Sequence, residues 1–160
     1  MKPIVIRTHT RPLRVVKYNR EGDIFFTAGD DGRISVYYSD SGERIGCIKT
    51  ATAVSTMDLT EDSELIVAGY NTGEIVFWKT NGGQQLGLFK LGALKIHLEF
   101  SLGGKYLLLA TCPHGGGSLH TSTIYVYDME EIKADFERIA DLNAHEEEKD
   151  LKLNVNPIYK

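Results

Sequence analysis

A 41-residue internal period constrains the fold of this chain more than any other feature of its sequence. Three segments align at this spacing, with the sequences YNREGDI at 18–24, LTEDSEL at 59–65 and FSLGGKY at 100–106. The same offset joins Ile34 to Ile75 and Tyr37 to Trp78. Ile124 follows Ile75 by 49 residues, so the third copy carries an insertion, which we place within 112–121. A fixed period of this length indicates repeated supersecondary units that pack against one another.

Each unit contains four short apolar runs separated by polar or glycine-rich turns. The runs cover 13–18, 24–28, 33–38 and 43–49 in the first unit and 53–59, 65–70, 74–79 and 84–90 in the second. Four strands in about 40 to 45 residues are typical of a blade of a WD40-type β-propeller. We therefore predict an all-β fold, a WD40-type β-propeller of about three and a half blades of four antiparallel strands, which is an incomplete ring.

The period divides the chain into segments. We expect residues 1–8 to be the ring-closing strand of a last blade, 9–49 blade one, 50–90 blade two, 91–143 blade three with the insertion at 112–121, and 144–160 the start of blade four. Apolar spacings of three and four residues predict a short helix over 129–136. A strand is expected at 137–143, and residues 151–156 resemble the innermost strand of a fourth blade.

Composition and charge exclude several classes of function. A net charge of −4 and an isoelectric point near 5.7 argue against a surface that binds phosphate backbones, so we expect no direct nucleic-acid binding. No apolar run approaches the roughly 18 residues that span a bilayer, and the N-terminal sequence does not read as a signal peptide. The two cysteines are typical of a reducing compartment. We expect a cytoplasmic protein that does not contact membranes.

Residues of the first unit carry a sharper likeness. The segments KYNREGDIFF at 17–26, VYYS at 36–39 and GERIG at 42–46 resemble the first blade of the i-subunit family of eukaryotic translation initiation factor three, whose members are WD40 proteins. The entry HTRPL at 9–13 and the AHE corner at 144–146 are similar to that family as well. The likeness is specific through residue 49 and weakens to a shared layout in the next two units.

The resemblance implies a hydrogen-bonded network inside the first blade. In WD40 blades a His before the first strand, a Ser or Thr on the second, an Asp in the next turn and a Trp on the third form a buried chain of hydrogen bonds. Carried over by position, these residues are His9, Thr27, Asp31 and Tyr37, with Tyr in place of Trp. The second blade keeps Trp78 but has Thr50 and Thr72 in place of His and Asp, and the third has Leu91 in place of His. The network is therefore expected only in the first blade.

The resemblance also implies a function. It predicts a noncatalytic interaction scaffold within initiation factor three, with the b and g subunits as partners and contact with the small ribosomal subunit through the complex. A WD40 adaptor of another signalling or RNA-processing pathway remains the alternative, because this fold serves many functions. Three and a half blades leave apolar faces and strand edges open, which predicts self-association through these edges.

The sequence predicts no catalytic site and no metal site. Cys112, His114 and His120 could bind zinc and support a metal-dependent enzyme, but their spacing matches no usual ligand pattern and a fourth ligand is not evident. We therefore assign no metal, no cofactor and no catalytic residue. Four carboxylates at 58, 61, 62 and 64 could form an acid pair, but a solvated strand and turn is the better interpretation.

Overall fold

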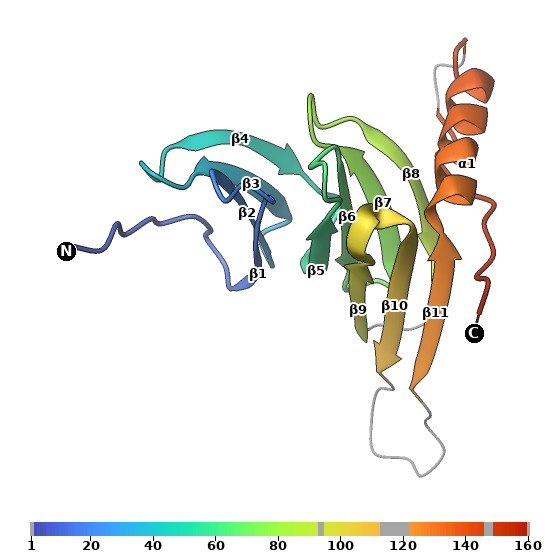
Figure 1. Ribbon diagram of the computed structural model, residues 1–160, viewed down its shortest axis with the longest axis horizontal. Coiled ribbons are helices and arrows are strands. Elements are labelled where there is room, and N and C mark those ends of the chain that lie inside the picture. The colour runs from blue at the N-terminus through green and yellow to red at the C-terminus, as the bar shows by residue number, and fades with distance from the viewer. Residues whose placement is uncertain (1, 93–94, 113–121, 146–148, 160) are drawn as a thin grey trace.

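Three antiparallel sheets follow one another along the chain and lie side by side (Figure 1). The computed structural model describes residues 2–92, 95–112, 122–145 and 149–159. The strands of the first sheet are β1 (Leu13–Tyr18), β2 (Ile24–Gly29), β3 (Arg33–Tyr38) and β4 (Arg44–Lys49), and those of the second are β5 (Val54–Leu59), β6 (Leu65–Tyr70), β7 (Glu74–Lys79) and β8 (Gln85–Lys90). The third contains β9 (Lys95–Phe100), β10 (Tyr106–Cys112) and β11 (Thr123–Asp128), with the 3-10 turn η1 (Leu102–Gly104) between the first two.

The first strands of the three sheets form the inner edge of the assembly. β5 packs against β1 on one side and against β9 on the other (Figure 1). Within every sheet each strand pairs with the next strand in sequence, so the sheets extend outward from this shared edge as the blades of a propeller do. The arrangement confirms the predicted all-β fold and the open ring.

Glycine in the middle turn of the first two blades follows from backbone geometry. Gly32 and Gly73 stand 41 residues apart between the second and third strands, and their φ angles are 68° and 88°. Side chains disfavour this left-handed region, so the tight turns that the repeat pattern predicts require glycine at these positions.

The hydrophobic core lies between the sheets. One cluster joins the first sheet to the second through residues such as Phe26, Ile34 and Ile66, and the other joins the second to the third through residues such as Val67 and Leu107. All six residues of β6 are buried, because neighbouring sheets cover both faces of the middle blade.

The third blade differs from the prediction. The expected strand at 137–143 is wrong, because one helix, α1 (Met129–Leu142), continues through it. The Asp128 carboxylate caps the helix by accepting a hydrogen bond from the backbone N–H of Glu130, and Glu130 and Glu131 place acidic side chains in its first turn. Phe136 of this helix packs edge-on against Phe77 of the second sheet, with ring centroids 5.3 Å apart. The sequence was correct in predicting helical spacing at 129–136 but ended the helix too early.

The residues after α1 do not form the predicted inner strand of a fourth blade. They return to the edges of existing sheets, where Leu88 of β8 donates its backbone N–H to Leu151 and accepts one from Leu153. Val126 of β11 exchanges two backbone hydrogen bonds with residues 158 and 159 in the same way. This C-terminal segment, residues 149–159, therefore occupies strand edges that would otherwise be open.

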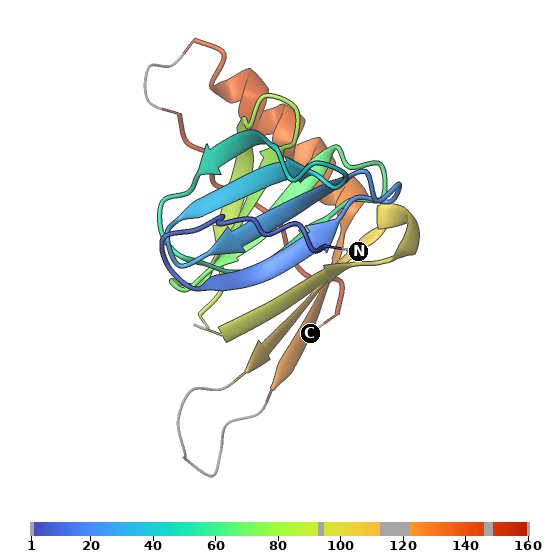
Figure 2. The same ribbon diagram turned by 90° about the vertical axis from the view of Figure 1, so that its left-hand side faces the viewer.

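The expected ring-closing strand at the N-terminus pairs with none of the sheets in the described residues. Residues 2–9 are assigned to no strand, and they run across the face of the first sheet that is turned away from the second (Figure 2). The Ile4 and Ile6 side chains approach Gly42 in the turn between β3 and β4.

Candidate functional site

His9 joins the N-terminal segment to the first sheet. Its Nδ1 lies 2.7 Å from Oδ1 of Asp31, and its Nε2 lies 2.7 Å from Oγ1 of Thr27. An ionised carboxylate only accepts hydrogen bonds, so Nδ1 carries the proton and donates it to Asp31, while Nε2 accepts from the Thr27 hydroxyl. The His9 and Asp31 side chains are 1% and 5% exposed. The geometry thus brings three of the four predicted network residues together, and their contribution to stability stays a prediction.

Tyr37, the fourth predicted member, is held in a different way. The residue is buried, and its ring stacks on Phe25 with centroids 5.2 Å apart. Within the described residues no hydrogen bond links Tyr37 to His9, Thr27 or Asp31. A phenol at the end of a six-membered ring places its polar atom differently from an indole N–H, which is why the substitution of Tyr for Trp changes the contact.

In the second blade, threonine hydroxyl groups make hydrogen bonds at the positions that correspond to the His9 network of the first blade. Thr50 donates a hydrogen bond to the backbone carbonyl of Thr52 at 2.8 Å, and Thr52 in turn donates to Oδ1 of Asn71 at 3.2 Å. Sequence reasoning missed this connection, although Thr50 stands 41 residues after His9. The Tyr70 phenol is buried beside Trp78, and burial raises its pKa to about 12.

Carboxylates of the second blade bind the third. Oδ2 of Asp58 accepts a hydrogen bond from the backbone N–H of Phe100 at 2.8 Å. Glu61 accepts one from the N–H of Gly103 at 3.1 Å and also contacts Arg20 of the first blade at 3.2 Å. The interpretation of these acids as solvated charge was incomplete, because they link neighbouring blades. The spacing could have indicated these contacts, because each acceptor residue lies 42 positions before the residue whose backbone N–H it accepts.

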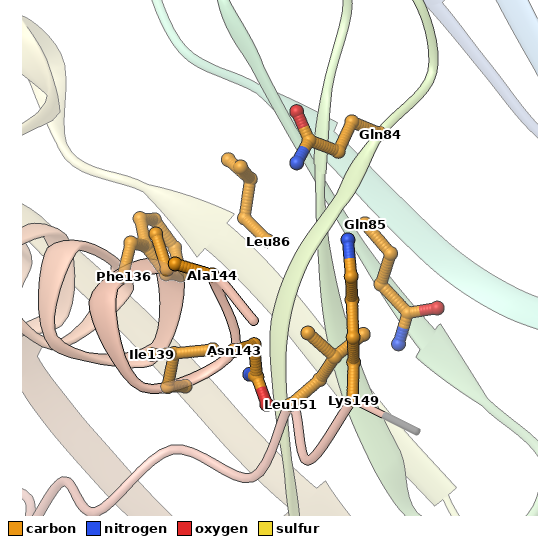
Figure 3. A pocket seen from close by; sticks show the side chains of 10 residues that line it. Gln84, Gln85, Leu86, Phe136, Ile139, Asn143, Ala144, Lys149 and Leu151 are labelled. Atoms are coloured by element: carbon orange, nitrogen blue, oxygen red, sulfur yellow. The ribbon is translucent and has the colours of Figure 1, made fainter. Parts of the chain in front are cut away.

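A pocket of about 420 Å³ lies between α1, β8 and the C-terminal segment (Figure 3). Phe136, Ile139 and Leu151 supply apolar wall, and the Asn143 side chain is already bonded to the backbone of Asp150. Among the described residues that line the pocket, Lys149 is the one titratable group. General acid–base or nucleophilic chemistry needs at least a pair of positioned groups, so this pocket provides no reaction centre.

The candidate zinc ligands cannot be placed together. His114 and His120 lie outside the described residues, as does the side chain of Cys112. In the part of the chain that the structure describes, no other group of three His, Cys, Asp or Glu residues could hold a metal ion. Within the same residues, α1 is too short and too polar to span a bilayer.

Comparison with known proteins identifies relatives by sequence. No protein-family model matches the chain. Eukaryotic translation initiation factor 3 subunit I from Rattus norvegicus and from Homo sapiens is 32% identical to it over 133 residues, which cover 82% of this chain and 41% of the relative. The subunit from Xenopus tropicalis is 31% identical over 134 residues, with 83% and 41% covered. The chain thus spans about two fifths of the length of these relatives.

Solved structures agree on the fold. The WD40 repeats of RRP9 and the structure of U3-55K each match with a TM-score of 0.66, covering 78% of this chain and 38% of the other. Sequence identity is 19% in both, so these matches show a shared WD40 architecture alone.

Proposed function

From the premise that this chain is a WD40-repeat homologue of eukaryotic translation initiation factor 3 subunit I, we propose that it is a noncatalytic interaction scaffold in that factor. One observation carries the proposal. The identity to subunit I extends over four fifths of the chain and is therefore not confined to a single repeat. Rigid blades of this kind present loops and strand edges to partner proteins.

The proposed partners are the b and g subunits, with contact to the small ribosomal subunit through the assembled complex in the cytoplasm. We keep the division into blades at 9–49, 50–90 and 91–143, and we propose that residues 1–8, assigned to no strand where they are described, can pair with a further sheet. Self-association of the chain stays a prediction from the sequence.

Affinity purification of the tagged chain from eukaryotic cells tests the scaffold proposal. We expect subunits of initiation factor three to be enriched and the chain to sediment with small ribosomal subunits in a gradient. A tagged WD40 protein of another complex provides the control for nonspecific capture. Enrichment of a different set of proteins would replace the proposal with an adaptor role in another pathway.

The noncatalytic assignment has its own test. Elemental analysis of the purified chain should find no stoichiometric zinc. One zinc per chain, lost when Cys112 and His120 are replaced by Ser and Ala, would contradict the assignment and favour a metal site in the insertion.

A further inference from the structure

Strand β4 forms the outer edge of the first sheet (Figure 1), and a pocket beside it faces the second sheet. We propose that β4 binds an extended segment of another protein as an added strand, with a leucine side chain seated over Gly46. The inference rests on the scaffold role proposed above and gives that role a binding surface. It follows from the internal repeat, because the equivalent site of the second blade is already occupied.

In the second blade, the outer strand β8 carries an added segment. Leu88 donates its backbone N–H to Leu151 and accepts the N–H of Leu153, both at 2.8 Å. The pairing is parallel, with Lys152 opposite Leu88. The Leu153 side chain is buried over Gly87, where a Cβ atom would lie 2.7 Å from Cδ2 of Leu153. The outer edge of this blade therefore binds an extended segment that has leucines at alternate positions.

The wall that holds Leu153 has a counterpart in the first blade. The core cluster of Leu153 contains or contacts apolar residues of β6, β7 and β8, which are Leu65, Val67, Phe77, Leu86 and Phe89. The residues 41 positions earlier lie on β2, β3 and β4 and are Ile24, Phe26, Val36, Ile45 and Ile48. Together with Gly46, the counterpart of Gly87, all of them line one pocket of about 380 Å³. The pocket repeats the seat of Leu153.

Among the described residues, none fills this seat in the first blade. A Cβ atom at Gly46 would meet no atom within 4 Å, in contrast to Gly87. Ile45 at the pocket is 46% exposed. The turn between β7 and β8, residues 80–83, forms the opposite wall, and its two glycines place no side chain there. The pocket therefore has room for an incoming aliphatic side chain.

The backbone of β4 is available in the matching register. Cys47 lies opposite Ser35 as Leu88 lies opposite Val76. Leu88 directs its N–H and C=O away from β7 and toward the added segment. The shared register gives Cys47 the same orientation, so its N–H and C=O face the outer edge, where no described residue pairs with them. Free edge groups of this kind favour pairing with an extended chain.

The charge of this edge defines the occupant. β4 carries Arg44 and Lys49 and no acidic residue. Lys49 lies opposite Arg33, whereas its counterpart Lys90 lies opposite Glu74. Like charges on neighbouring strands are unfavourable, so an anion beside them is stabilising. The occupant is therefore an extended segment that has leucines at alternate positions and acidic residues beside them.

A partner protein supplies this segment. Within the described residues, the leucine pair at 151 and 153 is engaged on β8, and the residue between them is Lys152. A lysine at that position would add to the positive charge of β4.

Fluorescence anisotropy of a labelled peptide tests the site on the whole chain. The probe is DLELNVN, the sequence of residues 150–156 with glutamate in place of Lys152. We expect saturable binding of one peptide per chain, weakened about tenfold or more when alanine replaces the second leucine of the probe. Gly46→Ala should also weaken binding about tenfold, because the new Cβ takes the space of the leucine side chain. In hydrogen exchange, the Cys47 amide should gain protection on binding while the Leu88 amide stays unchanged.

Two controls separate the seat from the charge. Gly92→Ala is the matched control, since a Cβ there also meets no atom within 4 Å and Gly92 lies outside the pocket. Lys49→Glu should remove the preference for DLELNVN over the unchanged sequence DLKLNVN. Far-UV circular dichroism checks folding, and Ile45→Ser replaces Gly46→Ala if that variant unfolds.

No saturable binding, binding that ignores Gly46→Ala, or exchange that changes at Leu88 and not at Cys47 would each overturn the proposal. Dimers of the chain that the peptide dissociates would assign the edge to a second copy and overturn the proposed occupant. A chain that fails the peptide test but co-purifies with initiation factor subunits would overturn the β4 site and leave the scaffold role standing. A chain that binds the peptide but co-purifies with another complex would do the reverse.

Discussion

Asp58 of the second blade binds the backbone of Phe100 in the third, with 2.8 Å between Oδ2 and the amide nitrogen. Phe100 is 8% exposed, so its N–H has little access to water as a substitute partner. The contact therefore fixes the position of the second blade relative to the third.

Replacing Asp58 by Ala should lower the free energy of unfolding by about 1 to 3 kcal/mol, because the Phe100 N–H loses its acceptor while it remains mostly buried. Urea unfolding followed by Trp78 fluorescence measures the change. Glu64→Ala is the control, since Glu64 is an exposed side chain of the turn between β5 and β6, and it should shift stability by less than about 0.5 kcal/mol. Equal effects for the two variants would show that the inter-blade bond contributes nothing.

The His9 network predicts coupled effects on stability. His9→Ala and Thr27→Val should each destabilise the chain by about 1 to 3 kcal/mol, because each leaves a buried polar atom without its partner. The double variant should cost less than the sum of the two, with a coupling of at least about 0.5 kcal/mol. Additive effects in this double-mutant cycle would contradict the assignment of His9 and Thr27 to one network.

Two buried tyrosines predict a loss of stability in alkali. Burial raises the pKa of Tyr70 and of Tyr127 to about 12, against about 10 in an unfolded chain. The folded state therefore binds these protons more tightly. The stability they contribute is fully present below pH 10 and is lost as the pH rises toward 12.

Absorbance titration of the phenols near 295 nm tests this order. The buried Tyr70 and Tyr127 should ionise late, near pH 12, and Tyr70→Phe should remove one of these late steps. In concentrated denaturant all phenols should titrate together near pH 10. A single transition near pH 10 in the folded chain would contradict the burial of these two rings.

The sequence predicts the sheets well because the information is local and repeated three times. Turn glycines such as Gly32 and Gly73 and the apolar runs between them define strands without any knowledge of tertiary contacts. The placing of His9, Thr27 and Asp31 together comes from the resemblance to WD40 blades, carried over by position. The contact of Tyr37 does not follow from position, since it depends on the reach of a side chain and not on its place in the pattern.

The strand predicted at 137–143 does not form, because this segment departs from the 41-residue period. Ile132, Phe136 and Ile139 keep helical spacing through the region assigned to a fourth strand, and Ile132 and Ile139 are buried. At this point the local apolar spacing, and not the repeat, determines the structure. The return of the C-terminal segment to β8 depends on contacts between distant residues, which no local pattern encodes.

Gly87 provides the sharpest test of that C-terminal contact. A Cβ atom at residue 87 would lie 2.7 Å from Cδ2 of Leu153, a buried residue of the C-terminal segment. Gly87→Ala should therefore force Leu153 away from β8 and destabilise the chain by about 1 to 3 kcal/mol. Gly46 is the matched control, because it stands 41 residues earlier in the first blade and a Cβ there meets no atom within 4 Å.

Hydrogen exchange separates this effect from a general loss of stability. In Gly87→Ala, the amides of Leu88 and Leu153, which are bonded across the contact, should exchange faster, while those of β2 and β3 keep their protection. Gly46→Ala should leave all of them unchanged. If both variants behave alike, Leu153 does not depend on the absence of a side chain at 87, and the C-terminal segment is held by its backbone hydrogen bonds alone.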